Sequence, residues 1–564
     1  MSFQSVSQAL RRILDKTVSR WALLSLAVVA AFGAFLRCLH LFSHQNYYVL
    51  SADSYFFQWL AQRVMAGEGP PLDAPSGAIY TLHTGLAYPL AYIAKAISYI
   101  FSLSSTDALD VTAKFSSPLL GVISLIVVYL AASRIFNRRV ALFSALTWAL
   151  MLNVVFIGAS GYLDRDGLSV LLIMSGAFVF YLSEGWQLHI GRMDFGWLAA
   201  GLVVLGLEAL LYLEWVFVGP VLLLVVLIAY FLVKLLLGYA SHVQKRQNVL
   251  HRLADALKES SWRTFSLIIG VNIIFILVNS GSSGWLRFMI NAIGAGGESG
   301  VAEMTGISLG DLLSFQLFLI PVVLGIYISW KKRSKGAIFF TSWFLVLLIL
   351  SLFAKRVLFY TMPAVCLLSG IGLSFLWGWQ RQGQSQYWKR AGVIALVCLL
   401  VLISFLMAAP ISSNSMVAVD KEWQDALTYV RDETPKEAVV MTNWGWGYWI
   451  LDLGQRRPVV DNGYYYYNDE KLRDVALTYL ATEPTEAAKI MEKYGADYLI
   501  FSKLDLDVAG TIMGWAGLHE NADAFPEDSL ITRTLSGEFE LGGGLEVVYR
   551  SVPQGEVFIL GLTN

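Results

Sequence analysis

Long apolar runs constrain the fold of this chain more than any other feature. Eleven of them come close to the about 20 residues that a helix needs to cross a bilayer. They are residues 21–42, 115–136, 139–158, 167–184, 195–213, 215–238, 264–280, 311–330, 336–353, 357–379 and 391–410. Hydrophobic residues make up 56% of the 564 residues and charged residues only 15%. The sequence therefore predicts a polytopic α-helical membrane protein, with about 11–13 transmembrane helices in residues 1–410.

Two apolar segments near the N-terminus need a separate interpretation. Run 21–42 follows four basic residues and lacks a small-residue cleavage site, so we expect a retained helix rather than a signal peptide. Stretch 86–103 is interrupted by Pro89 and Lys95, which favours a helix lying at the membrane surface.

The three cysteines are too few and too dispersed for a disulfide framework or a zinc site. The net charge of -1 gives no indication of nucleic-acid binding.

Basic residues orient the predicted helices. Alternate loops hold about twenty Lys and Arg in one set and about seven in the other, and the richer set belongs on the cytoplasmic side. With eleven spans, residues 411–564 then lie outside the cytoplasm. The loops predicted to lie on the same side are 43–114, 159–166, 281–310 and 354–356.

The polar C-terminal part, 411–564, predicts a soluble domain of mixed α/β structure. Expected strands are Ala438–Thr442, Pro458–Asp461 and Asp497–Ser502, with helices at Trp423–Val430 and Thr485–Tyr494. The tail segments Gly537–Tyr549 and Gly555–Leu562 predict antiparallel strands. Between the first two strands lies an aromatic turn, Asn443–Trp449, and Tyr464–Tyr467 follow soon after. Such a cluster of aromatic residues is typical of three arrangements: packing in a hydrophobic core, a belt at the membrane interface, or the wall of a peptide-binding site.

Charged residues in the outer loops are the candidates for chemistry. Asp53 precedes an amphipathic stretch, Asp164 and Asp166 form an Asp-x-Asp pair, and Glu303 ends a glycine-rich loop. Carboxylates of this kind can bind a hard divalent cation. Each also has a structural explanation, because an aspartate before a helix is often its N-cap. Arg356 opens a late helix, where it either contacts a substrate or extends to the membrane surface.

Taken in order, these motifs resemble the catalytic subunit of oligosaccharyltransferase in its single-subunit bacterial or archaeal form, a GT-C membrane glycosyltransferase. The resemblance covers nearly the whole chain and includes the aromatic turn followed by Val-Asp-Asn at 460–462. It implies that an oligosaccharide moves from a polyprenyl-pyrophosphate lipid to an asparagine of an acceptor polypeptide, with inversion. It implies a lone subunit in a prokaryotic plasma membrane, with the active site on the extracytoplasmic side. Mn²⁺ or Mg²⁺ would be held by Asp53, Asp164, Asp166 and Glu303.

Within that resemblance, Asp53 and Glu303 would accept hydrogen bonds from the amide of the acceptor asparagine. An amide nitrogen is a poor nucleophile because its lone pair is delocalised into the carbonyl group. Two carboxylates that hold both N–H bonds would weaken this conjugation and aim the nitrogen at the sugar. Arg356 would contact a side chain of the acceptor upstream of that asparagine.

The aromatic turn departs from the family's Trp-Trp-Asp-Tyr-Gly signature, which grips the Ser or Thr two residues after the acceptor asparagine. Aligned on Gly447, this chain has Asn-Trp-Gly-Trp-Gly, so Gly445 replaces the aspartate. Loss of that carboxylate removes an interaction of roughly 1.5–3 kcal/mol with a hydroxyl group. The residues that the resemblance assigns to acceptor binding are Arg356, Trp444, Gly445, Trp446, Ile512 and Met513.

Three other functions remain open. The first is a polyprenyl-dependent GT-C glycosyltransferase that modifies a hydroxyl, a lipid or a glycan. The second is a transporter, which the position of the acids in loops and the lack of an internal repeat disfavour. The third is a non-catalytic paralogue, which the altered turn favours and the four acidic residues disfavour.

Overall fold

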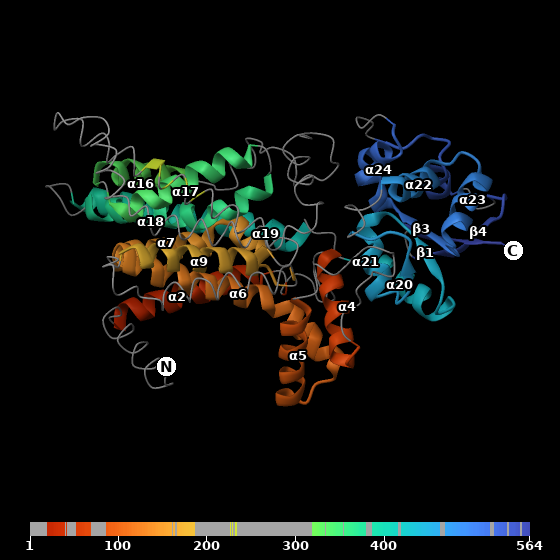
Figure 1. Cartoon of the computed structure of the whole chain (residues 1–564), viewed down its shortest axis with the longest axis horizontal. Helices are drawn as coiled ribbons and strands as arrows, with labels where there is room; N and C mark the ends of the chain where they lie inside the picture. The colour runs from red at the N-terminus through yellow and green to blue at the C-terminus, as the bar shows by residue number, and fades with distance from the viewer. Residues whose placement is uncertain are drawn as a thin grey trace. The chain divides into compact units, whose positions relative to one another are not determined.

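The computed structural model describes residues 20–39, 41, 52–68, 86–160, 162–163, 166–185, 226, 228, 230, 232–233, 318–332, 334–352, 355–379, 386–414, 419–462, 469–518, 524–537, 541–552 and 555–563 (Figure 1). Their contacts divide the chain into two compact units. The first comprises Met1–Ser43, Ser117–Ala159 and Arg165–Asn414. The second comprises His44–Ser116, Ser160–Asp164 and Ser415–Asn564.

The described residues of the first unit are mostly helical. Its helices are α2 (Arg20–Arg37), most of α6 (Ser105–Ile135), α7 (Arg138–Leu150), α8 (Leu152–Ile157), α9 (Asp166–Gly185), α16 (Leu319–Lys332), α17 (Lys335–Ser351), η4 (Lys355–Thr361), α18 (Met362–Trp379) and α19 (Gln386–Asn414). Two stretches of the described residues are long and apolar enough to cross a membrane, Ser105–Ile135 and Val357–Gly378. Three shorter apolar helices are Trp21–Arg37, Gly336–Ser351 and Ala391–Met407. The predicted spans 195–213 and 264–280 lie outside the described residues.

Some predicted spans differ from the helices in detail. Run 139–158 is two helices rather than one, because Met151 has an extended backbone between α7 and α8. Run 357–379 begins as the 3₁₀ helix η4 before α18 starts at Met362. Hydropathy detects an apolar stretch but is insensitive to these local changes of backbone geometry.

Glycine permits the close packing of α18 against α16. A Cβ atom on Gly325 would collide with the backbone carbonyl of Leu368, and one on Gly372 would collide with the carbonyl of Pro321. Small residues at helix contacts let two backbones approach closely, a frequent device in membrane helices. The side chain of Thr147 also donates a hydrogen bond of 3.2 Å to Ser369, which joins α7 to α18.

In the second unit, α4 (Ala52–Ala66) and α5 (Ala87–Phe101) precede a mixed sheet and its helices. The strands are β1 (Val439–Met441), β2 (Arg457–Pro458), β3 (Tyr498–Ser502), β4 (Leu545–Arg550) and β5 (Val557–Leu562). The other helices are α20 (Lys421–Glu433), η5 (Trp444–Trp446), α21 (Gly447–Asp452), α22 (Asp469–Leu480), α23 (Pro484–Tyr494), η7 (Lys503–Val508), α24 (Ala509–Trp515) and α25 (Leu530–Ser536).

The sheet has the order β2-β1-β3-β5-β4. Strand β1 runs parallel to β2 and β3, whereas β5 is antiparallel to β3 and β4. The predicted antiparallel tail is therefore present, but β4 begins at Leu545, well after the expected start at Gly537. The carboxyl ends of β1 and β3 meet at one edge of the sheet, the usual place for ligands in open α/β sheets.

Helix α4 packs directly on α21, the helix that follows the aromatic turn. The rings of Phe56 and Tyr448 stack with centroids 4.7 Å apart, and Tyr55 meets Trp449 edge-on at 6.5 Å. Most of α4 is buried, including Tyr55, Phe56 and Phe57. A segment of the first predicted outer loop thus shares a hydrophobic core with the C-terminal residues.

Candidate functional site

Asp53 lies in the first turn of α4 and is half-buried. The next residue, Ser54, is fully buried, and its hydroxyl oxygen accepts a hydrogen bond of 2.9 Å from the backbone N–H of Leu163. Leu163 directly precedes Asp164 in the sequence. The first and second acidic segments are therefore linked by a buried hydrogen bond at residues adjacent to their aspartates.

The other members of the predicted acidic set are less completely described. Asp164 and Glu303 lie outside the described residues, and Asp166 and Arg356 are described only in their backbones, at the starts of α9 and η4. Among the residues with a described position, no group of three or more His, Cys, Asp or Glu could hold a metal ion. The four predicted acidic residues would supply carboxylate oxygens, the ligand type that Mg²⁺ and Mn²⁺ prefer.

The aromatic turn is a single 3₁₀ turn, η5, that continues into α21. The side-chain oxygen of Asn443 accepts a hydrogen bond of 3.2 Å from the N–H of Gly445, and the backbone N–H of Asn443 donates to the hydroxyl of Tyr479 at 2.8 Å. An asparagine that bonds its own backbone two residues on stabilises a turn of this kind. A Cβ atom on Gly445 would meet nothing within 4 Å.

Asp505 anchors this turn, a role that the sequence motifs do not indicate. Its Oδ1 accepts hydrogen bonds from the indole N–H of Trp446 at 2.7 Å and from the amide of Asn443 at 3.0 Å. Its Oδ2 accepts from the backbone N–H of Ser502 at 2.8 Å, which completes a capping box at the start of η7. Burial raises the pKa of this carboxyl group to about 6, although the three hydrogen bonds oppose the shift. The available signal was its position just after β3, the strand parallel to β1.

The aromatic residues of the turn divide into a packed set and a half-buried one. Trp446 and Trp449 stack with centroids 4.6 Å apart, and both contact Trp423 of α20. Trp444 is half-buried and meets Trp515, the last residue of α24, edge-on at 5.6 Å. Packing therefore accounts for Trp446 and Trp449, while Trp444 and Gly445 keep accessible surface.

Helix α24 carries the two remaining residues predicted to bind an acceptor. Ile512 is 2% exposed and Met513 is 3% exposed. The contact between Trp444 and Trp515 brings their helix beside the aromatic turn. Their side chains themselves belong to the core. Tyr464–Tyr467 lie outside the described residues.

No protein-family model matches the chain. Curated relatives include dolichyl-phosphooligosaccharide-protein glycotransferase 1 of Pyrococcus furiosus, 31% identical over 141 residues, which are 24% of this chain and 15% of that protein. Glycotransferase 2 of the same organism is 23% identical over 527 residues, 81% of this chain and 68% of the relative. The chain thus spans a small part of the first relative's length and about two thirds of the second's.

Solved structures with a similar fold include archaeal oligosaccharyltransferases and ArnT. The archaeal oligosaccharyltransferase AglB from Archaeoglobus fulgidus, in complex with an inhibitory peptide and a dolichol-phosphate, gives a TM-score of 0.73 at 14% identity, over 94% of this chain and 80% of that one. The same organism's enzyme in complex with Zn and sulfate gives 0.68 at 15% identity, over 93% and 79%. ArnT from Cupriavidus metallidurans, bound to undecaprenyl phosphate, gives 0.52 at 13% identity, over 96% and 97%.

Proposed function

We propose that this chain, which is related by sequence and by fold to the catalytic subunits of oligosaccharyltransferases, transfers an oligosaccharide from a polyprenyl-pyrophosphate lipid to an asparagine of an acceptor polypeptide. The hydrogen bond between Leu163 and Ser54 is the observation that supports this function most directly. It joins two of the three segments that carry the acidic residues, as a shared carboxylate site needs. Buried polar contacts of this kind are rarely incidental, because an unpaired N–H would be costly there.

In this proposal, Asp53, Asp164, Asp166 and Glu303 hold Mn²⁺ or Mg²⁺. When bound, the cation supplies a positive charge that stabilises the leaving pyrophosphate. The carboxylates of Asp53 and Glu303 accept hydrogen bonds from the two N–H bonds of the acceptor amide, which frees the nitrogen lone pair and directs it toward C1 of the sugar. The new C–N bond forms as the C–O bond to the pyrophosphate breaks, with inversion at C1, and the nitrogen gives up one of its two protons to one of these carboxylates.

Recognition of the acceptor is expected to differ from that of relatives that carry the motif aspartate. Asp505 does not replace it, because this carboxylate is fully buried and already accepts three hydrogen bonds. Gly445 leaves open space at the position of the motif aspartate. Trp444 and Gly445 would therefore contact the acceptor through aromatic and backbone surface, with Trp446, Ile512 and Met513 as the support beneath them. Arg356 would contact an acceptor side chain upstream.

The setting proposed for this reaction is the extracytoplasmic face of a prokaryotic plasma membrane. The distribution of Lys and Arg in the loops supports this side for residues 411–564 and for the acidic loops. Because the chain resembles single-subunit bacterial or archaeal forms of the enzyme, we propose that it acts as a single subunit.

A second candidate is a GT-C enzyme that transfers a polyprenyl-linked sugar to a hydroxyl, lipid or glycan acceptor. Two observations favour it, the fold similarity to ArnT and the glycine at position 445. A hydroxyl acceptor needs a general base but no clamp for an amide. Glu303 would then be dispensable for activity, whereas Asp53 would not.

A transfer assay distinguishes the two functions. The purified chain, Mn²⁺ and a short-chain polyprenyl-pyrophosphate sugar are incubated with paired peptides that contain Asn-x-Thr or Asn-x-Ala. Transfer to peptide that is lost in Asp53→Asn and in Glu303→Gln, but kept in Glu437→Gln, an exposed control residue, supports the first function. Metal-dependent consumption of the donor without transfer to either peptide would favour the second. A donor left intact in every reaction would contradict both.

A further inference from the structure

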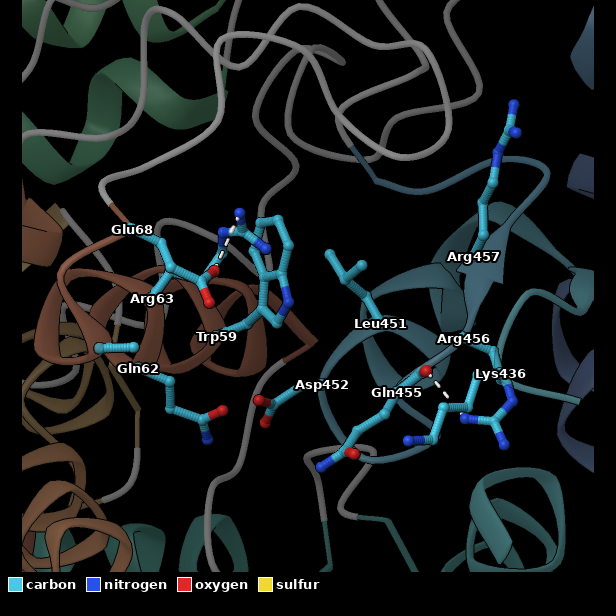
Figure 2. Close-up of a pocket in the computed structure, with 11 residues that line it drawn as sticks. Trp59, Gln62, Arg63, Glu68, Lys436, Leu451, Asp452, Gln455, Arg456 and Arg457 are labelled. Carbon is cyan, nitrogen blue, oxygen red and sulfur yellow. Dashed lines mark hydrogen bonds and ion pairs between the residues drawn. The ribbon is translucent and has the colours of Figure 1, made fainter. Parts of the chain in front are cut away.

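A pocket of about 500 Å³ lies within the second unit. One wall is the C-terminal half of α4, and the other is the segment from the end of α21 to β2, with Lys436 beside it (Figure 2). This volume falls in the range of about 300–1,000 Å³ that is typical of small-molecule sites. None of the residues predicted to bind metal or acceptor lines it.

Asp452 is the unusual member of the lining. It ends α21 and is only 6% exposed, and its Oδ1 is buried without a hydrogen-bond partner among the described residues. Figure 2 shows its carboxyl group directed toward the side of the pocket where Gln62 lies. Burial raises the pKa of this group to about 8. Because buried polar atoms nearly always have a partner, an unpaired one beside a pocket indicates that a ligand supplies it.

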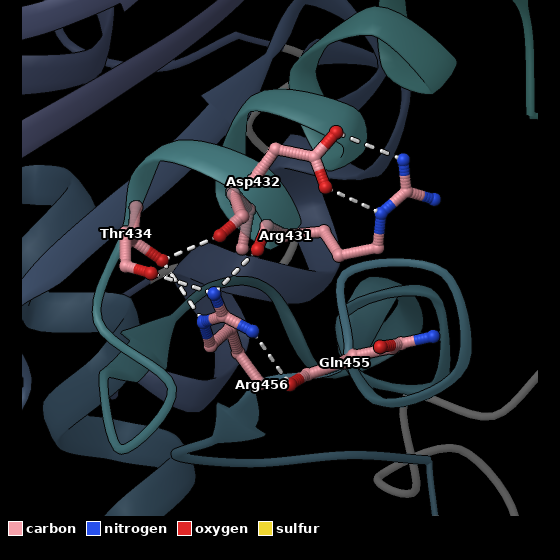
Figure 3. A network of polar contacts seen from close by, with 6 residues as sticks. Arg431, Asp432, Thr434, Gln455 and Arg456 are labelled. Atoms are coloured by element: carbon pink, nitrogen blue, oxygen red, sulfur yellow. Dashed lines mark hydrogen bonds and ion pairs between the residues drawn. The ribbon is translucent and has the colours of Figure 1, made fainter.

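The wall that carries Asp452 is held rigidly. Arg456 donates hydrogen bonds to the hydroxyl and the carbonyl of Thr434 and to the carbonyl groups of Arg431 and Gln455 (Figure 3). These contacts fix the turn in which Gln455 has a φ of 48° and an exposed side chain. The backbone of Gln455 is thereby fixed beside the pocket, so a ligand would need to order only its side chain.

The charges of the lining disfavour an ionic ligand of either sign. Burial favours the protonated form of Asp452 at neutral pH, and Lys436 and the three arginines of the lining then repel a cation. For an anion, Arg456 already donates within the protein, Arg63 is paired with Glu68 at 3.1 Å, and Figure 2 shows Arg457 directed away from Asp452. Lys436 is then the single basic side chain of the described lining that an anion could contact. What remains is a mixture of donors and acceptors, the amides of Gln62 and Gln455 and the carboxyl of Asp452, beside the apolar surfaces of Trp59 and Leu451.

We propose that this pocket binds a carbohydrate, as a short neutral segment of an oligosaccharide that contacts Asp452, Gln62 and Gln455. Sugar hydroxyl groups both donate and accept, so they can satisfy a carboxyl and two amides at once. The C–H faces of a sugar ring suit Leu451 on one wall and, on the other, the part of Trp59 that Arg63 leaves uncovered. This goes beyond the transfer reaction, because the binding needs neither the acidic loops nor a metal ion.

Direct binding tests the proposal without relying on transfer. The full chain is placed in phosphatidylcholine nanodiscs, because glycosidic detergents carry sugar headgroups that would compete. Mannotriose, cellotriose and triacetylchitotriose are titrated by calorimetry and by saturation-transfer NMR, beside inorganic phosphate and trilysine. We expect millimolar or tighter binding of at least one trisaccharide. Gln62→Ala with Gln455→Gly should weaken it about tenfold or more, since two hydrogen bonds are lost. Glycine suits the left-handed backbone at 455.

The controls make each outcome decisive. Glu437→Gln lies outside the lining and next to Lys436, and it should bind like the parent chain. Asp53→Asn should abolish transfer and leave trisaccharide binding intact, which separates this proposal from the proposed function. No trisaccharide binding, unchanged affinity in the double variant, or binding of phosphate or trilysine alone would each overturn the carbohydrate assignment.

Discussion

Asp505 illustrates how one buried carboxylate can fix a loop whose sequence has changed. It joins Asn443 and Trp446, two positions at which the chain departs from the family signature, to the end of β3. Asn443 contributes to the same arrangement by accepting from the N–H of Gly445. Asp505 lies 62 residues after Asn443 and 59 after Trp446 in the sequence. The sequence therefore predicted the turn but not the residue that anchors it.

Removal of this carboxylate should destabilise the protein. Asp505→Ala would leave an indole N–H, an amide and a backbone N–H buried without their acceptor, at a cost of about 3 kcal/mol or more. The apparent melting temperature of the full chain, followed by tryptophan fluorescence, should fall by several degrees. Asp505→Asn keeps one acceptor oxygen, so its apparent melting temperature should fall less. Equal melting temperatures for the parent chain and the alanine variant would refute an anchoring role.

The buried carboxyl of Asp452 should make stability depend on pH. Its pKa of about 8 lies above the value of about 3.9 in an unfolded chain, so the folded state binds the extra proton. Stability should therefore decrease as pH rises from about 4 to 8, by up to about 1.4 kcal/mol per pH unit. Asp505, with a pKa of about 6, adds to this trend only up to about pH 6. Melting curves at constant heating rate between pH 6 and 8.5 should show a flatter trend for Asp452→Asn than for Glu437→Gln.

The open space at Gly445 predicts a change of acceptor preference. Gly445→Asp should fit without a collision and return a carboxylate to the aromatic turn. If the chain transfers sugar to asparagine, the ratio of rates for Asn-x-Thr over Asn-x-Ala peptides should rise about tenfold to a hundredfold, the equivalent of 1.5–3 kcal/mol. Gly445→Asn, which has the same shape without the charge, is the matched control. An unchanged ratio in the aspartate variant would mean that the hydroxyl is recognised elsewhere.

At the scale of elements, the apolar runs located the described helices, but their ends match closely only for some of them; α6, for example, begins ten residues before run 115–136. Runs 167–184 and 336–353 match α9 and α17 to within two residues at each end. The break at Met151 and the 3₁₀ turn of η4 were not predicted, because both depend on tertiary contacts rather than on hydropathy. In the C-terminal part, the strands at 439–441 and 498–502 were expected, whereas α25 occupies the approach to β4.

Packing between α16 and α18 should be sensitive to a single methyl group. Gly372→Ala would force a Cβ atom onto the carbonyl of Pro321 and separate the helices, at a cost of about 1–3 kcal/mol. Gly378→Ala lies in the same helix with nothing within 4 Å of the new atom, so it should be neutral or slightly stabilising. The two variants are compared by the half-life of the folded protein in nanodiscs at an elevated temperature. A similar loss for both would argue against close packing at Gly372, because helix propensity favours alanine at each position.

At the scale of the whole molecule, the order of the acidic residues predicted a shared site, but the linkage between them needed coordinates. Nothing near Ser54 in the sequence indicates that its hydroxyl contacts the residue before Asp164. The carboxylate set remains a prediction from resemblance, since the side chains of Asp164, Asp166 and Glu303 lie outside the described residues.

The Ser54–Leu163 hydrogen bond should matter for metal affinity more than for folding. Ser54→Ala leaves the buried N–H of Leu163 unpaired, which should loosen the segment that carries Asp164. We expect the Mn²⁺ concentration for half-maximal transfer to rise about tenfold, in line with other outer-shell substitutions at metal sites. Ser54→Thr keeps the hydroxyl and should restore most of the affinity. A Mn²⁺ requirement that is the same in all three chains would argue against this linkage.

The packing of α4 against α21 also has a consequence for biosynthesis. About 380 residues separate the end of α4 from the start of α21. At about 5–20 residues per second, the ribosome releases α4 some 20–80 s before its partner exists. During that interval the rings of Phe56 and Tyr55 lack the tyrosine and tryptophan that will cover them. A protecting factor or the lipid surface must shield this helix until translation is nearly complete, and mistimed synthesis should expose it to proteases.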